Sequence, residues 1–135
     1  MAVTTTLQWV GEKNFIGVDS GRRSVVLSGQ ADGIGVKPSE MLLIALASCS
    51  SVDVVEILAK KRKPLTRLDV VTSAERDPKP PWAYRKIHLH YRLAGAGLTE
   101  KAVAQAIQLS QEKYCSVAAT VRGVAEITTG FEIIS

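Results

Sequence analysis

Several features are scarce in this sequence of 135 residues, and each scarcity excludes a class of protein. No apolar run reaches the roughly 18 residues that a membrane-spanning helix needs, and the start, MAVTTTLQWV, lacks the basic segment and apolar core of a signal peptide. Only five prolines and ten glycines occur, beside 22% charged residues, which excludes collagen-like and disordered chains. We therefore expect a folded, cytoplasmic protein that does not enter a membrane.

Cysteine occurs only twice, at Cys49 and Cys115, 66 residues apart. A reducing compartment disfavours a structural disulfide between them. Cys49 lies in a small polar stretch, residues 48–51, inside an apolar helix, and Cys115 lies where another helical turn can start. A helix start lowers the pKa of a thiol, but free cysteines are more often small core residues. From the residues alone, both interpretations stay open.

Other chemical signatures are weak. His88 and His90 form an HxH pair, but Ile87, Leu89 and Tyr91 occupy the inward face of the same predicted strand, so the histidines face solvent. We therefore expect no metal site.

A glycine-rich segment and a basic segment show no specific binding motif. Residues 29–35 lack the spacing of a nucleotide-binding loop, so we expect a linker and no cofactor. The net charge is only +4, and the basic cluster at residues 60–63 has no interleaved aromatic residues, so we expect no nucleic-acid partner.

A long helix is predicted from Pro38 to Lys63. Pro38 suits a first helical turn, residues 41–47 are apolar around the whole circumference, and Pro64 ends the pattern after the basic cluster. About 26 residues span about 39 Å, as long as a compact monomer of this size. A single small domain cannot easily bury such a helix on every side, so we predict a homodimer.

The remaining pattern predicts an α+β fold in a single domain, residues 1–135. Short antiparallel strands around residues 7–27 precede the long central helix. A β-hairpin follows, from the alternating residues 68–74 and 87–93. Thr99 caps a second helix with a buried stripe, and a final strand covers residues 124–134. That stripe is formed by Val103, Ala106, Ile107 and Tyr114.

The segments PSEMLLIALASCSSVDVV and KYCSVAATVRG, in this order and at this separation, resemble the OsmC/Ohr superfamily of osmotically inducible and organic hydroperoxide resistance proteins. The resemblance implies an OsmC-like fold and an intertwined homodimer, with the long helix buried between subunits. It also implies a cysteine-based peroxidase of the antioxidant stress response, acting on organic hydroperoxides. Cys49 would become a sulfenic acid, Cys115 would resolve it, and a dithiol or lipoyl-type reductant would restore both thiols.

The sequence departs from that family's peroxidases at two positions. Ser39 stands where they carry a glutamate, and Glu40 is one place late on the helix. Phe15 lies near the position of an activating arginine, with Arg22 and Arg23 further along. We therefore expect Cys49 to have a weakly lowered pKa and to be slow. The alternatives are a dimeric module that binds a small lipophilic molecule beside Cys49, or a redox sensor.

Overall fold

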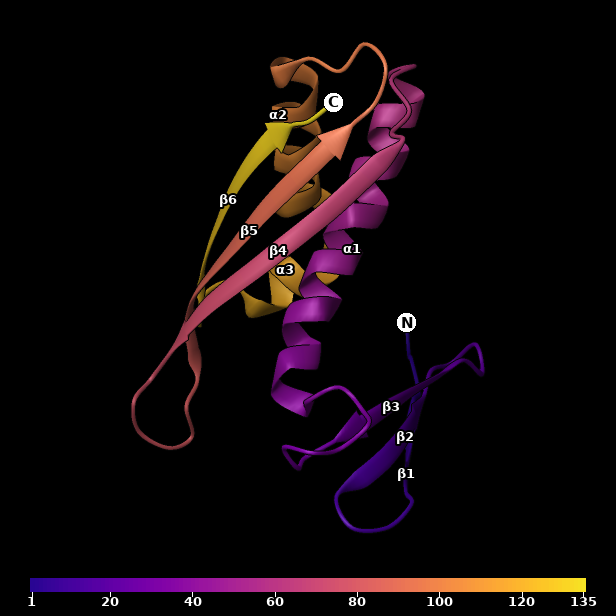
Figure 1. Cartoon of the computed structure of the whole chain (residues 1–135), viewed down its shortest axis with the longest axis vertical. Coiled ribbons are helices and arrows are strands. Elements are labelled where there is room, and N and C mark those ends of the chain that lie inside the picture. Colours follow the sequence, from indigo (N-terminus) through magenta and orange to yellow (C-terminus); the bar gives the residue numbers. More distant parts are fainter. The chain divides into compact units, whose positions relative to one another are not determined.

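The structure is a computed structural model that describes all 135 residues. The chain forms three strands, a long helix, two more strands, a helical region and a last strand, in the order that the sequence predicted, which confirms the α+β class (Figure 1). The chain divides into two compact units, Met1–Leu43 and Ile44–Ser135.

The first unit contains one antiparallel sheet. Asp19 shapes its second turn, because Asp19 Oδ1 accepts hydrogen bonds from the backbone N–H groups of Gly21 and Arg23, at 2.8 and 2.9 Å. Arg22 lies between them with a φ of 65°. The strands lie in the order β1–β2–β3, as the sequence predicted. They are β1 (Thr6–Trp9), β2 (Asn14–Val18) and β3 (Ser24–Ser28).

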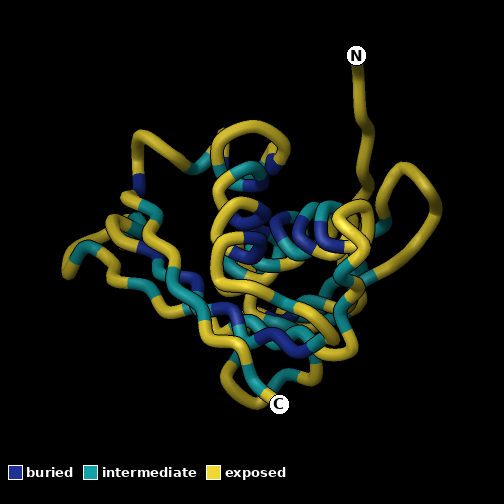
Figure 2. The backbone as a smooth tube through the Cα atoms, turned by 90° about the horizontal axis from the view of Figure 1, so that it is seen from above, coloured by how far each residue is buried: buried dark blue, intermediate teal, exposed yellow.

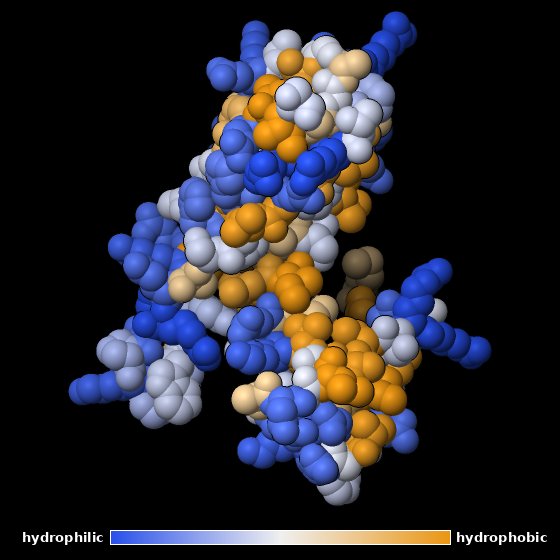
Figure 3. Space-filling view, in the orientation of Figure 1, coloured by the Kyte–Doolittle hydropathy of each residue, from blue (hydrophilic) through white to orange (hydrophobic).

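This sheet leaves apolar side chains uncovered. Leu7 and Trp9 are 63% and 64% exposed, and Val26 is also exposed. Figure 3 shows hydrophobic atoms gathered on this part of the chain. A sheet face of this kind needs a covering surface for stability.

The long helix α1 (Pro38–Lys60) ends three residues before the predicted Lys63. Arg62 adopts a left-handed conformation with a φ of 60°, and the N–H of Lys63 bonds back to the carbonyl of Leu58 at 2.9 Å. This closing pattern satisfies the last carbonyls of a helix and reverses the chain. Only Lys60 of the basic cluster therefore lies in the helix, and residues 61–63 belong to the closing turn.

One face of α1 is buried and another is exposed, so the single chain does not cover the helix on every side. Ile44, Val52 and Val55 are exposed, at 48%, 59% and 45%. The helix is also long and apolar enough to cross a membrane by length and composition, although such a helix equally forms the core of a soluble protein. Its buried residues recur four apart: Leu46, Ser50, Val54 and Leu58.

The second unit is built on a three-stranded sheet in the order β4–β5–β6. The predicted hairpin is confirmed as the antiparallel pair β4 (Arg67–Arg76) and β5 (Tyr84–Ala94). Strand β6 (Glu126–Ile133) pairs with β5 in parallel, which the sequence did not predict. Buried positions alternate along β5, and Figure 2 shows dark blue segments on the helices and the sheet. The inward residues of β5 are Ile87, Leu89, Tyr91 and Leu93.

Helix α2 (Glu100–Leu109) has the predicted cap, because Thr99 Oγ1 accepts a hydrogen bond from Ala102 N at 3.1 Å. Val103, Ala106 and Ile107 are buried as expected. Tyr114 is 53% exposed, so its place in the buried stripe was wrong. The reason is that the helix widens into a π-helical turn and changes which side chains face inward. That turn is η1 (Ser110–Tyr114), followed by helix α3 (Ser116–Val121).

Candidate functional site

The two cysteines lie on different elements of the second unit. Cys49 is a half-buried residue of α1, one position before the fully buried Ser50. Cys115 follows the π-turn, is only 2% exposed, and caps α3 by accepting a hydrogen bond from Ala118 N at 3.4 Å. The helical start that the sequence suggested at Cys115 is therefore present.

The structure places the two cysteines close enough for each thiol to influence the pKa of the other. Cys49 Sγ also lies 4.0 Å from the hydroxyl oxygen of Ser116. Two residues far apart in the chain thus meet because α3 begins beside the middle of α1.

Hydrogen bonding decides the ionisation of Cys49. Burial raises the pKa of the Cys49 thiol. Hydrogen bonding has the larger total effect, so the pKa falls below the ordinary 9.0. The donors are the backbone N–H of Val117, the Cys115 thiol, and the hydroxyl and N–H of Ser116. These leading donors are all uncharged. Within the second unit, the Cys49 thiolate is therefore stabilised by Cys115 and by the first turn of α3.

Cys115 is shifted in the opposite direction. Burial raises the pKa of its thiol to about 11, and the neighbouring Cys49 adds to the increase. The pair thus holds one sulfur that ionises easily and one that remains a protonated donor.

The positions where the sequence departs from the peroxidase pattern lie in the first unit. Ser39 is in the first turn of α1, Phe15 is in β2, and Arg22 and Arg23 form the β2–β3 turn. The sequence reasoning missed the donors of Ser116 and Val117. A small residue directly after a cysteine at a helix start is the signal that indicates them.

A group of polar side chains surrounds Ser50, the residue that follows Cys49. We call Ser50, Asp53, Tyr91, Ser110 and Gln111 the hydroxyl cluster. Ser50 Oγ and Tyr91 Oη are 2.5 Å apart, and the Ser110 hydroxyl donates to Asp53 Oδ2 at 2.8 Å. Burial raises the pKa of Tyr91 above its usual 10.0 despite hydrogen bonds from Ser50 and Gln111, so the phenol stays protonated.

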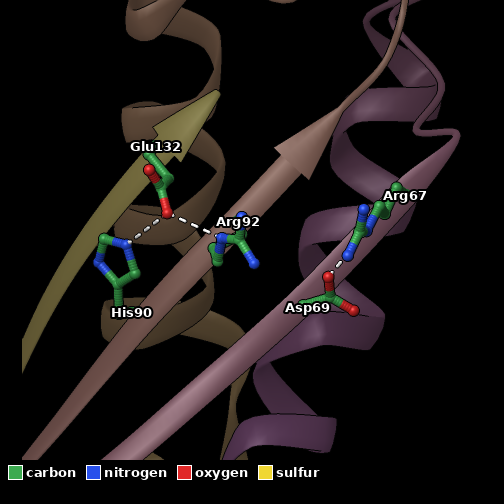
Figure 4. A network of polar contacts seen from close by, with 5 residues as sticks. All are labelled: Arg67, Asp69, His90, Arg92 and Glu132. Atoms are coloured by element: carbon green, nitrogen blue, oxygen red, sulfur yellow. Dashed lines mark hydrogen bonds and ion pairs between the residues drawn. The ribbon is translucent and has the colours of Figure 1, made fainter. Parts of the chain in front are cut away.

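The histidine pair faces away from this site, as predicted. His88 Nδ1 is 2.7 Å from Thr128 Oγ1, and His90 Nε2 is 3.3 Å from Glu132 Oε1. Glu132 also accepts from Arg92 Nε at 2.8 Å, so it lies between two β5 side chains (Figure 4). These contacts lower the pKa of Glu132. No group of three metal-ligating side chains is present.

A cavity of about 660 Å³ lies between α2 and β6. Ile107, Ile127 and Phe131 supply its apolar wall, and Gln111 and Arg122 supply polar groups. Neither cysteine lines it, so it is not the lipophilic groove beside Cys49 that the binding-module alternative requires.

The fold defines a known class of protein. Residues 29–130 match the family described as OsmC-like protein, and the chain belongs to this family.

Individual relatives cover almost the whole chain. Protein YhfA of Escherichia coli K12 is 34% identical over 129 residues, 96% of each chain. A hypothetical protein of Aquifex aeolicus has a similar crystal structure, with a TM-score of 0.88, 31% identity, and coverage of 99% of this chain and 97% of that one. The organic hydroperoxide resistance protein OhrB of Bacillus subtilis shares the fold at a TM-score of 0.63 and 11% identity, covering 98% of both chains.

Proposed function

We propose that this protein is a cytoplasmic thiol peroxidase that reduces organic hydroperoxides through Cys49 and Cys115, as part of an antioxidant stress response. The observation that carries the proposal is the proximity of a thiol whose pKa is lowered to a second thiol that stays protonated. Such a pair provides a nucleophile and a resolving group at one place.

In the first step, the Cys49 thiolate attacks the distal oxygen of a hydroperoxide ROOH. The sulfur–oxygen bond forms while the O–O bond breaks, and the leaving alkoxide takes a proton to become ROH. Cys49 is oxidised by two electrons to a sulfenic acid, and the peroxide is reduced by two electrons. The donors from Ser116 and Val117 stabilise the thiolate before attack.

In the second step, the Cys115 sulfur attacks the Cys49 sulfenic acid. The disulfide bond forms, and the hydroxyl group leaves with the Cys115 proton as water. A dithiol or lipoyl-type reductant then exchanges with the disulfide, returns two thiols and is itself oxidised. A buried Cys115 with a raised pKa does not compete with Cys49 for the peroxide.

We further propose a homodimer in which a second copy covers the exposed face of α1. Ile44, Val52 and Val55 expose apolar side chains on one side of that helix. With that face covered, the apolar composition of α1 is accounted for by burial in a protein interface. An exposed apolar helix face of this kind on a soluble chain is typical of an oligomer interface.

The test is hydroperoxide consumption by the reduced protein. The reduced protein should consume one equivalent of cumene hydroperoxide and lose both thiols. Mass spectrometry should then find a disulfide within one chain. Cys49→Ser should consume none. Cys115→Ser should consume one equivalent of peroxide to form the Cys49 sulfenic acid, and a second equivalent should convert it to the sulfinic acid. Equal consumption by Cys49→Ser would contradict the proposal.

The alternative from another class is a redox-sensing or ligand-binding module. It shares the cysteine pair but requires no rapid turnover with a reductant. A protein that forms its disulfide once, and is not recycled by dihydrolipoamide over repeated additions of peroxide, would support the sensor instead.

A further inference from the structure

The π-turn that ends at Cys115 is anchored at its first residue. The N–H of Cys115 donates to the carbonyl of Ser110 at 2.8 Å, which closes the wide turn. The Ser110 hydroxyl donates to Asp53 Oδ2 at 2.8 Å and lies 3.1 Å from Ser50 Oγ. Ser50 directly follows Cys49. A short path of hydrogen bonds therefore joins the turn of α1 that carries Cys49 to the π-turn that precedes Cys115.

A second arm braces the same turn. Gln111 Nε2 lies 3.3 Å from Ser50 Oγ and 3.4 Å from Tyr91 Oη, and the Gln111 carbonyl accepts a hydrogen bond from Arg122. The π-turn is thus held from α1, from β5 and from the end of α3.

Burial makes these contacts strong. Ser50, Tyr91 and Ser110 are all 0% exposed, so water does not compete for their hydroxyls. A lost partner inside such a network leaves a buried polar group unsatisfied. The three-sided anchoring therefore resists displacement of the segment that carries Cys115.

We infer that the hydroxyl cluster is a positioning device for the resolving step, and that Ser110 is its central positioning residue. This inference rests on the proposed peroxidase function. The cluster fixes the distance over which the Cys115 sulfur reaches the oxidised Cys49 sulfur, and it leaves the peroxide-attacking side of Cys49 untouched.

The need for such a device follows from a competition. The Cys49 sulfenic acid either meets Cys115, with loss of water and formation of the disulfide, or meets a second hydroperoxide, which oxidises it to a sulfinic acid that a dithiol does not reverse. Disulfide formation is faster than overoxidation only if Cys115 is held close to Cys49. Displacing a reacting group by about 1 Å can slow a step about a hundredfold.

Ser110→Ala tests the inference, with Ser51→Ala as the matched control. Ser51 also lies beside Cys49, but its hydroxyl bonds only within α1, to the carbonyl of Ala47 at 2.7 Å. At a pH where alkylation shows Cys49 to be fully ionised in both proteins, Ser110→Ala given one equivalent of cumene hydroperoxide should lose the Cys49 thiol at the parent's rate, within about twofold. Its disulfide should form at least about tenfold more slowly. With excess peroxide, its sulfinic acid fraction should rise.

A second measurement does not depend on peroxidase activity. The equilibrium between the dithiol and disulfide forms in glutathione buffers reports the effective concentration of one thiol at the other. Ser110→Ala should lower that effective concentration about tenfold or more, and Ser51→Ala should leave it unchanged. This result can support the positioning role even if the parent protein fails to consume peroxide.

Tyr91→Phe provides a variant that removes a hydroxyl and no volume, in case Ser110→Ala does not fold. It should retain the parent's circular dichroism spectrum and lower the effective concentration in the same direction. Equal disulfide rates and equal glutathione equilibria in Ser110→Ala, Tyr91→Phe and Ser51→Ala would overturn the inference.

Discussion

Cys49 and Cys115 lie close together, and the pKa values of their thiols are shifted in opposite directions. Hydrogen bonds from Val117, Cys115 and Ser116 lower the pKa of Cys49 below 9.0, whereas burial and the neighbouring Cys49 raise that of Cys115 to about 11. This difference assigns Cys49 the attacking role and Cys115 the resolving role in the proposed reaction.

The first prediction concerns selective alkylation. Between pH 7 and pH 9, iodoacetamide should modify Cys49 and leave Cys115 intact, because thiolate reacts and only Cys49 ionises in that range. Peptide mass spectrometry at each pH measures both sites. Modification of Cys115 first would contradict the assigned order.

The two pKa values should also depend on each other. Cys115→Ala removes a donor from Cys49, so the alkylation midpoint of Cys49 should move to higher pH. Cys49→Ala removes the neighbour that raises the pKa of Cys115, so that midpoint should move below about 11. Thiolate absorbance near 240 nm follows each single-cysteine variant. Unchanged midpoints in both would mean that the thiols do not interact in solution.

The rate of hydroperoxide reduction should increase with pH. Below the pKa of Cys49, each pH unit removes about tenfold of the thiolate, so consumption should rise with pH, with a midpoint below 9.0. Cys49→Ser serves as the blank. A rate already saturated at pH 6 would indicate a cation beside Cys49.

The dimer is tested on the exposed face of α1. The parent protein should sediment as a dimer at micromolar concentration, and Val52→Glu with Val55→Glu should sediment as a folded monomer, because two charges then replace buried apolar contacts. Val71→Glu is the matched control, since Val71 is equally exposed, at 59%, on the sheet. A dimer that survives the α1 changes would place the interface elsewhere.

Periodicity predicted most of the fold. The alternation along β5 indicated which residues face inward, and Thr99 marked the start of α2, because both signals are local. The end of α1 was placed too late because a basic residue, Arg62, adopts the left-handed conformation that glycine usually signals. The exposure of Tyr114 followed from a π-turn that has no sequence signature.

The site was less predictable than the fold. The two cysteines could be singled out, but the donors at Ser116 and Val117 depend on how α3 approaches α1, which is a tertiary contact. The same applies to Ser110, which looks like an ordinary polar residue near the end of a helix until its distance to Asp53 is known.

The separation of the cysteines along the chain also gives their oxidation state a thermal consequence. A bond between Cys49 and Cys115 closes a loop of 66 residues that includes β4, β5 and α2. In the chain-entropy treatment, closing a loop of that length lowers the conformational entropy of the unfolded state, which stabilises the folded state by about 4 kcal/mol. The oxidised form should therefore melt at a higher temperature than the reduced form in scanning calorimetry, so that each cycle of oxidation and reduction raises and then lowers the thermal stability of the second unit.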